Sequence, residues 1–346
     1  MKGTFNLKIT AVVFAASLFA SALPAASAKT PSPVVLKLPG GSQGIGFDDL
    51  QYSSILKMVL APAAQTGDLD LIAPGSLKIS TISGFSREKS FKGGHGEGIT
   101  SVSENGRFLF VTDRTTRLLN VVNESTRKVV ASVNLGGGPD YVRWVAPTHE
   151  IWVTEPGRSG IEIFKLPSGA NPVPVHSGFI HVEGGPEALC IDSTRNRAYT
   201  NLWSNKTLAI NLKTRKVVAR WPNGNAGSRG LALDSARGFL FVGGKNGRAV
   251  VLDVNHGGKI LSSLKSGLGV DIIDYDPALR HLYLPGARSA TMAVIGVSSK
   301  GSLTLLKVLP TVKGAHSVVA APDGKVFVCD PRQGALLVYK DTLPKA

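Results

Sequence analysis

The sequence predicts an all-β fold made of repeated four-stranded sheets, and three observations support this prediction. The chain of 346 residues contains 39 Gly and 20 Pro, a composition that favours many short elements joined by tight turns. Short apolar segments rich in β-branched residues alternate with polar turns along the chain. The pattern repeats every 42 to 50 residues, which is the length of a four-stranded unit.

The first residues are predicted to be a secretory signal peptide covering residues 1–28. Lys2 and Lys8 flank the start of an apolar run over residues 9–16, and Ala26–Ala28 provides small residues for cleavage. The run is too short for a membrane span. Since the segment carries two lysines and no acid, its removal lowers the formal net charge from +15 to +13. We therefore expect a basic, secreted or periplasmic protein that begins at residue 29.

The clearest repeat begins at Gly184 and shows how each unit is built. Its alternating apolar and polar residues predict four strands, and the two turns between them are rich in Ser, Asn and basic residues. The strands are expected at Ala188–Asp192, Arg197–Leu202, Thr207–Leu212 and Lys216–Trp221. Four short antiparallel strands in succession are typical of one blade of a β-propeller.

Seven copies of this unit can be aligned on the residue before the first strand. That residue is Asp48, Gly98, Asp140, Glu187, Arg229, Asp271 or His316. The second strands carry a common motif, seen as Phe-Val-Thr-Asp at residues 110–113 and Ala-Tyr-Thr-Asn at residues 198–201. The motif resembles the Tyr-Val-Thr-Asn repeat of YVTN-family β-propellers, although the first copy at Lys57–Pro62 departs from it. The resemblance implies a fold and no particular activity.

The last copy predicts how the ring closes. It supplies three strands, at Ser317–Ala321, Lys325–Asp330 and Ala335–Lys340, before the chain ends. Pro33–Leu38 is strand-like and belongs to no other copy, so we expect it to provide the missing outer strand, which would protect an otherwise open sheet edge. The sequence therefore predicts one domain over residues 29–346, a seven-bladed β-propeller whose last blade is closed by the N-terminal strand.

The two cysteines are not expected to form a disulfide. Cys190 lies in the first strand of the fourth copy and Cys329 in the second strand of the seventh, so three blades separate them, whereas a disulfide requires Cα atoms within about 7 Å. Both are predicted to be small buried hydrophobic residues.

The residues aligned before the first strands should surround one mouth of the central channel. This ring contains Asp48, Asp140, Arg229 and Asp271, together with Glu187 and His316, and His95 and Glu97 precede the second copy. Carboxylates and imidazoles are ligands for divalent metals, and His95, Glu97, Glu187 and His316 form the most ligand-like subset. The alternative is that these groups are polar because water fills the channel. Arg229 would repel a cation and can instead pair with Glu187 or Asp271.

The turns between second and third strands should form a rim on the same face. They carry basic residues and one tryptophan, which are Arg114, Arg158, Trp203, Lys245, Arg288 and Arg332. Such a rim suits an anionic ligand, because guanidinium groups bind carboxylate and phosphate in bidentate fashion, and Trp203 could stack on the ligand. The alternative is that these charges only keep the turns soluble.

Two functional hypotheses follow, and the sequence favours the first. One is a non-catalytic binding or scaffold protein that holds a small anionic ligand or an envelope protein on this charged face. The other is a metal-assisted lactonase, hydrolase or lyase, in which His95 or His316 would transfer a proton beside one divalent ion. No catalytic template is complete, and scattered basic residues without interleaved aromatics argue against nucleic acid. The sequence indicates no other cofactor and no oligomeric state.

Overall fold

The computed structural model describes residues 1–4 and 32–346. All of the predicted signal peptide except its first four residues therefore lies outside the described residues. Ser32–Ala346 forms one compact unit. No helix within the described ranges is long and apolar enough to span a membrane.

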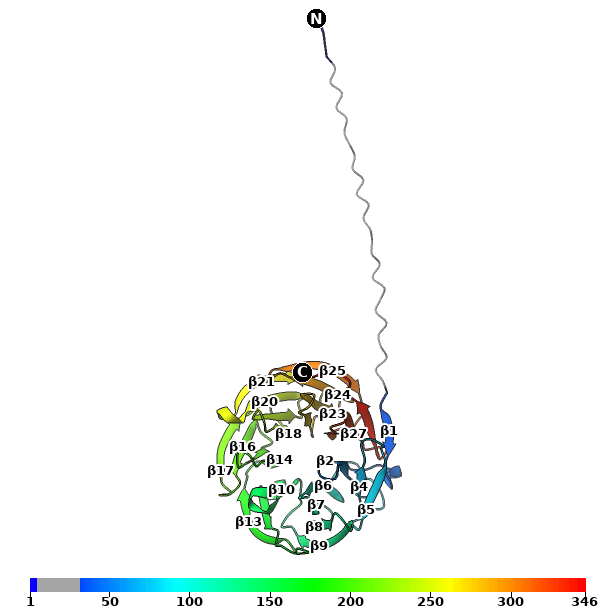
Figure 1. The fold of residues 1–346 in the computed structure, drawn as a ribbon, viewed down its shortest axis with the longest axis vertical. Coiled ribbons are helices and arrows are strands. Elements are labelled where there is room, and N and C mark those ends of the chain that lie inside the picture. Colours follow the sequence, from blue (N-terminus) through cyan, green and yellow to red (C-terminus); the bar gives the residue numbers. More distant parts are fainter. Residues whose placement is uncertain (5–31) are drawn as a thin grey trace. The chain divides into compact units, whose positions relative to one another are not determined.

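Ser32–Ala346 folds into seven four-stranded antiparallel sheets arranged in a ring (Figure 1). The first four blades contain β2 Gln51–Ser53, β3 Met58–Pro62, β4 Asp68–Ile72 and β5 Ile79–Ser83; β6 Ile99–Glu104, β7 Phe108–Asp113, β8 Leu118–Asn123 and β9 Lys128–Asn134; β10 Val142–Val145, β11 Glu150–Glu155, β12 Gly160–Lys165 and β13 Val175–His181; and β14 Glu187–Asp192, β15 Arg197–Asn201, β16 Lys206–Asn211 and β17 Val217–Pro222.

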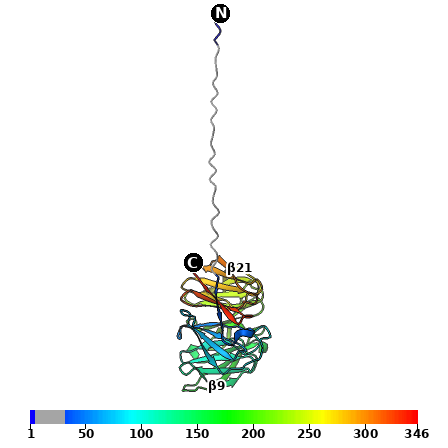
Figure 2. The same ribbon diagram turned by 90° about the vertical axis from the view of Figure 1, so that its right-hand side faces the viewer.

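The other three blades follow in chain order. They contain β18 Ser228–Asp234, β19 Phe239–Gly244, β20 Arg248–Asp253 and β21 Lys259–Lys265; β22 Asp274–Asp276, β23 His281–Gly286, β24 Thr291–Val297 and β25 Leu303–Pro310; and β26 Val318–Ala320, β27 Lys325–Asp330, β28 Ala335–Lys340 and β1 Val34–Lys37. Short 3₁₀ helices occur at η1 Gly41–Gln43, η2 Ala146–Thr148, η3 Pro156–Arg158 and η4 Val254–His256. Figure 2 shows the ring from its side, with β9 and β21 at opposite margins.

The predicted seven-bladed propeller is confirmed, and so is its closure by the N-terminal strand. β1 lies antiparallel on β28, with Val34 opposite Val338 and Lys37 opposite Ala335. In Figure 1 the two ends of the chain's colour range, blue β1 and red β27, meet in this blade. The blade order β1-β28-β27-β26 leaves no blade with only three strands in the described part of the chain.

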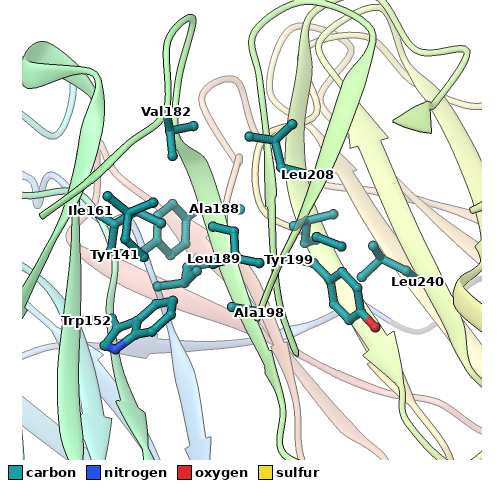
Figure 3. Packing of buried hydrophobic residues seen from close by; sticks show 14 of the residues in the cluster. Tyr141, Trp152, Ile161, Val182, Ala188, Leu189, Ala198, Tyr199, Leu208 and Leu240 are labelled. Carbon is teal, nitrogen blue, oxygen red and sulfur yellow. The ribbon is translucent and has the colours of Figure 1, made fainter. Parts of the chain in front are cut away.

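The core lies between neighbouring blades, and burial follows the position of each strand within its blade. The second strand β15 is buried at four of its five residues, whereas the outermost strand β17 alternates between half-buried and exposed residues. Alternation of this kind arises because successive side chains of a strand point to opposite faces. Trp152 of the third blade and Tyr199 of the fourth are among the largest buried side chains, and both contribute to the cluster drawn in Figure 3.

One face of the ring gathers the opening of each blade and its second turn. In four blades, a backbone N–H just after the second strand donates a hydrogen bond to a backbone carbonyl that precedes the first strand of the same blade. These hydrogen bonds are Arg114 to Gly98 (2.8 Å), Trp203 to Gly184 (2.9 Å), Lys245 to Gly227 (3.0 Å) and Ala287 to Gly269 (3.1 Å). We call this the mouth face. The turns between first and second strands and between third and fourth strands lie on the opposite side, which we call the far face.

Candidate functional site

The residues that open the blades meet at the mouth of the channel, as the alignment predicts. The second blade has Gly98 at this place because the backbone there has a φ of +71° and a Cβ atom would lie 2.1 Å from the carbonyl group of Ala64. Only glycine fits such a close approach without displacing the neighbouring blade. Side chains from other blades fill the space that remains.

Arg114 lies at the centre of this cluster, although the sequence assigns it to the outer rim. Its guanidinium bridges Asp48, at 2.7 Å, and Asp140 of the neighbouring blade, and its Nε donates to the Pro139 carbonyl at 2.9 Å. The side chain is only 13% exposed. Arg114 therefore joins three blades across the mouth, and most of its donors are already used.

The two carboxylates beside Arg114 have different electrostatic environments. Burial opposes ionisation of Asp48, but the neighbouring His95 and Arg114 outweigh it and hold the pKa of Asp48 below its usual range. Burial raises the pKa of Asp140 well above its usual range despite Arg114, and the charge of Asp48 adds to this effect. Because the two groups share one guanidinium, their protons are lost in two coupled steps.

His316 is held by hydrogen bonds at both ring nitrogens. Nδ1 lies 2.6 Å from the Gly314 carbonyl and Nε2 lies 2.8 Å from the Phe47 carbonyl. A carbonyl oxygen can only accept, so both nitrogens carry protons in this arrangement and the ring is cationic. Burial works against this charge, but contacts with Cys329, Asp271 and Gly314 raise the pKa of His316 well above its usual range.

His95 lies beside His316, with 5.4 Å between the ring centroids. Its Nδ1 is 2.6 Å from Nη1 of Arg114. The same nitrogen lies 3.2 Å from Oδ2 of Asp48, so it faces one group that can only donate and one carboxylate. The ligand atoms of His95, Asp271 and His316 all lie within 4.8 Å of one another, which is close enough for one metal ion.

The other two predicted metal ligands lie in different contacts. Glu97 pairs with Lys92 at 2.9 Å. Glu187 pairs with Arg229 at 2.8 Å and also accepts from Nε1 of Trp203. The pairing of Arg229 with Glu187 is one of the two that the sequence suggests. The compact group therefore contains Asp271 in place of both glutamates.

Trp203 connects the mouth to the rim. Its side chain is 45% exposed, and its ring nitrogen is oriented by Glu187. An exposed indole that is fixed at one end offers a flat apolar surface to a ligand at little cost in side-chain entropy.

The remaining rim residues divide into paired and unpaired groups. Arg158 pairs with Glu155 at 2.8 Å and lies over the Phe179 ring. Lys245, Arg288 and Arg332 are exposed, and none has an acidic group within 4 Å among the ion pairs of the described residues. These three side chains remain free to meet a negatively charged partner.

A cavity of about 600 Å³ occupies the channel between the mouth and the far face. It was not predicted. Its lining includes Asp49, Arg143, Asp274 and Asp276, and also Cys190. Both cysteines are free, as expected, but Cys190 is half-buried and borders this cavity, so the prediction that it is wholly buried is wrong. The Asp-Tyr-Asp sequence at residues 274–276, which makes up the whole innermost strand β22, was the available signal.

Comparisons with known proteins support the fold. The sequence matches no protein-family model and no curated protein. One similar solved structure is a chain of the mitotic checkpoint complex, with 15% identity and a TM-score of 0.73 over 97% of this chain and 99% of that chain. A chain of Kuenenia stuttgartiensis hydrazine synthase has 13% identity and a TM-score of 0.68 over 93% of this chain and 99% of that chain. The β-propeller domain of Myceliophteria thermophila Cps50 (Swd1) has 11% identity and a TM-score of 0.72 over 90% of this chain and 100% of that chain. Likeness at this level of identity shows the fold alone. The chain is a seven-bladed β-propeller, a scaffold commonly used for binding and protein interactions.

Proposed function

We propose that this propeller is a secreted or periplasmic binding protein of the YVTN type, and that its mouth face holds an anionic partner. The observation that supports this most strongly is the contrast between the mouth and the rim. At the mouth, Arg114 and Arg229 pair with carboxylates of the protein itself. On the rim, no acidic side chain of residues 32–346 forms an ion pair with Lys245, Arg288 or Arg332.

The charge of the face therefore comes from its rim. The mouth carboxylates are offset by two guanidinium groups and by the cationic ring of His316. The basic side chains around them add positive potential without internal compensation, and such a field attracts anions and accelerates their association. A carboxylate or phosphate group would find charge-assisted hydrogen-bond donors there and an aromatic surface at Trp203.

Charge reversal on the two faces tests this proposal. The triple variant Lys245→Glu, Arg288→Glu, Arg332→Glu changes the mouth face. The matched control Lys213→Glu, Lys300→Glu, Lys345→Glu changes three exposed lysines that lie in far-face turns or in the C-terminal segment, and it alters the net charge by the same amount.

Binding of citrate, inorganic phosphate and poly-glutamate would be measured by calorimetry at two salt concentrations. We expect the rim variant to lose at least tenfold in affinity for the anions that the protein binds, and the control to lose less than twofold. Equal losses in both variants would show a non-specific charge effect and would contradict the proposal. Binding of poly-glutamate but not citrate would identify the partner as a macromolecule.

A second candidate is a metal site, with the enzymatic activity that it would allow. His95, Asp271 and His316 are close enough to hold one divalent ion. The ion would require His316 to release one of its two carbonyl hydrogen bonds, and it would compete with Arg114 for Nδ1 of His95. Such an ion could polarise a carbonyl in a lactonase, hydrolase or lyase. Stoichiometric zinc or manganese in protein purified without chelator, lost in Asp271→Asn, would support this candidate; its absence after reconstitution would reject it.

A further inference from the structure

The cavity inside the ring differs in character from the mouth above it. It reaches from Tyr141 and Ile272, each one residue past a mouth position, to turns of the far face at Ser235 and Pro277. At about 600 Å³ it falls within the size range of small-molecule sites. It lies inside the channel, whereas the anion site proposed above lies on the outer rim of the mouth face.

Most of the cavity wall is apolar. Apolar residues from the first strands of several blades, or from the segments just before them, line it, including Leu189, Leu231, Ile272, Val318 and Val319. Ala188, Ala232 and Ala320 leave room where larger residues would fill the channel. Such a wall favours a ligand with an apolar body, because burying that body removes its surface from water.

One ion pair on the wall is complete within the protein. Arg143 binds Asp49 through both of its terminal nitrogens, at 2.6 and 3.0 Å, and also donates to its neighbour's carbonyl at Val142. Asp49 is 1% exposed and has no access to other cations. The positive charge of Arg143 is therefore matched before any ligand enters.

Two further carboxylates on the wall have no cation. Asp274 accepts backbone hydrogen bonds from Tyr275 and Ala320, each at 2.8 Å, and Asp276 accepts from Ala278 at 2.7 Å through Oδ1. Neither has a basic group within 4 Å among the ion pairs of the described residues. Asp276 is only 5% exposed, and Oδ2 of this residue takes part in no hydrogen bond within that part of the chain.

The charges on the wall consequently do not balance. Three carboxylates face one guanidinium, and the thiol of Cys190 adds no charge at neutral pH because burial raises its pKa to about 12. Burial also raises the pKa of Asp274 to about 6, so this carboxyl is ionised at pH 7.5. Negative charge in an apolar enclosure is unfavourable unless a positive group approaches it.

We propose that the cavity binds an organic cation, a protonated amine carrying an apolar body, with its ammonium directed to the carboxylates of Asp274 and Asp276. The apolar wall contacts the body of the ligand, and the two carboxylates select its charge. An organic anion fits less well because the only guanidinium on the wall already binds Asp49 in bidentate fashion.

Three probes of similar shape and different charge test the inference at pH 7.5: 2-phenylethylamine, 2-phenylethanol and 3-phenylpropionate. Calorimetry or ligand-observed NMR would give their affinities for the full chain. We expect the amine to bind at least tenfold more tightly than the alcohol, and the carboxylate to bind most weakly. A carboxylate that binds as well as the amine would overturn the proposal.

Variants locate the site. Asp274→Asn and Asp276→Asn should each lower amine affinity at least fivefold while leaving the alcohol unchanged. Asn keeps one acceptor oxygen, which replaces the single accepting oxygen of Asp276 and one of the two accepting oxygens of Asp274. Glu183→Gln, an exposed acid near the mouth face, is the matched control and should change nothing. Ala320→Leu narrows the cavity and should weaken amine and alcohol alike. Thermal melting would show that each variant folds.

The two proposals can fail separately. The rim variant with three reversed charges should bind 2-phenylethylamine as the unmodified protein does, since its substitutions lie on the other face. Amine affinity that survives in the double variant Asp274→Asn, Asp276→Asn would refute the cavity site and leave the anion site untouched. Loss of anion binding in that same double variant would instead show that the two ends are not independent.

Discussion

Arg114 lies between Asp48 and Asp140 at the mouth of the channel, whereas Asp274 and Asp276, nearer the far face, form no ion pair with any described residue. Both pairs of carboxylates lie in or next to first strands, and all four are at least partly buried. The difference lies in the neighbouring blades, which supply a guanidinium to one pair and only apolar side chains or backbone N–H groups to the other. Charge that is balanced within the protein stabilises the fold, and charge that is not balanced is available to a ligand.

The largest effect is expected from removing the central guanidinium of the mouth. Arg114→Met should lower the free energy of unfolding by about 3–5 kcal/mol, because it removes the guanidinium that the buried carboxylates of Asp48 and Asp140 share. Urea denaturation at pH 7.5 would measure this. Arg114→Lys keeps a charge and should lose less. A loss below about 1 kcal/mol in Arg114→Met would mean that the mouth is already well hydrated.

A smaller effect is expected from His316→Gln. Two hydrogen bonds from a charged donor are lost or weakened, which should lower stability by about 2 kcal/mol at pH 6. Because the pKa of His316 is raised in the folded state, its contribution is complete below the unfolded pKa and is lost as pH rises through the folded pKa. Unfolding free energies across pH 6 to 10 should therefore decline in the unmodified protein and be flatter in the variant. The same slope in both proteins would assign the decline to another group.

Asp274→Asn should raise the free energy of unfolding near neutral pH, whereas the two substitutions above lower it. The pKa of Asp274 is raised from 3.8 to about 6 by burial, so the folded state holds its proton more tightly, and stability falls as pH rises from about 4 to 6. The variant removes this dependence. We expect it to be more stable than the parent above pH 6 because it carries no buried charge, but by only about 1 kcal/mol, because the amide nitrogen of Asn cannot accept one of the two backbone hydrogen bonds that Asp274 accepts. If the stability of the variant fell more steeply with pH than that of the parent, Asp274 would not be an uncompensated charge.

The smallest effect on stability is expected at the rim. Reversing Lys245, Arg288 and Arg332 should change the free energy of unfolding by less than about 0.5 kcal/mol, since exposed unpaired charges contribute little to the folded state. Thermal or urea denaturation of the triple variant would check this. A large loss would show that the rim has a structural role, and its effect on anion binding would then need a different explanation.

The sequence predicted the ring better than the contacts within it. Strand alternation and the repeat length depend on residues close together in the chain, so the seven blades and the closing strand could be predicted. Which side chains meet at the mouth depends on how neighbouring blades are placed relative to one another around the ring. Arg114 therefore appeared to belong to the rim, although its long side chain reaches inward to Asp48.

The cavity could not be predicted for a related reason. Whether a channel is filled or hollow depends on the total volume of the side chains that many blades place at the same depth. No pattern within one stretch of sequence predicts that volume. Cys190 is an example: its strand was predicted correctly, but nothing in its own strand indicated that it borders the cavity. The two acids of β22 were visible in the sequence, but their lack of a cation was not.

The pairing of β1 with β28 also determines how the chain must fold. Six of the blades are formed from consecutive strands, so their contacts are local and can form early, while the seventh requires Val34 to find Val338 near the other end of the chain. Loop-closure entropy makes that search the slow part of folding. A circular permutant with joined ends, reopened between β1 and β2, would convert this long-range pairing into a hairpin. It would leave every blade local, and only side-chain packing between two blades would then close the ring.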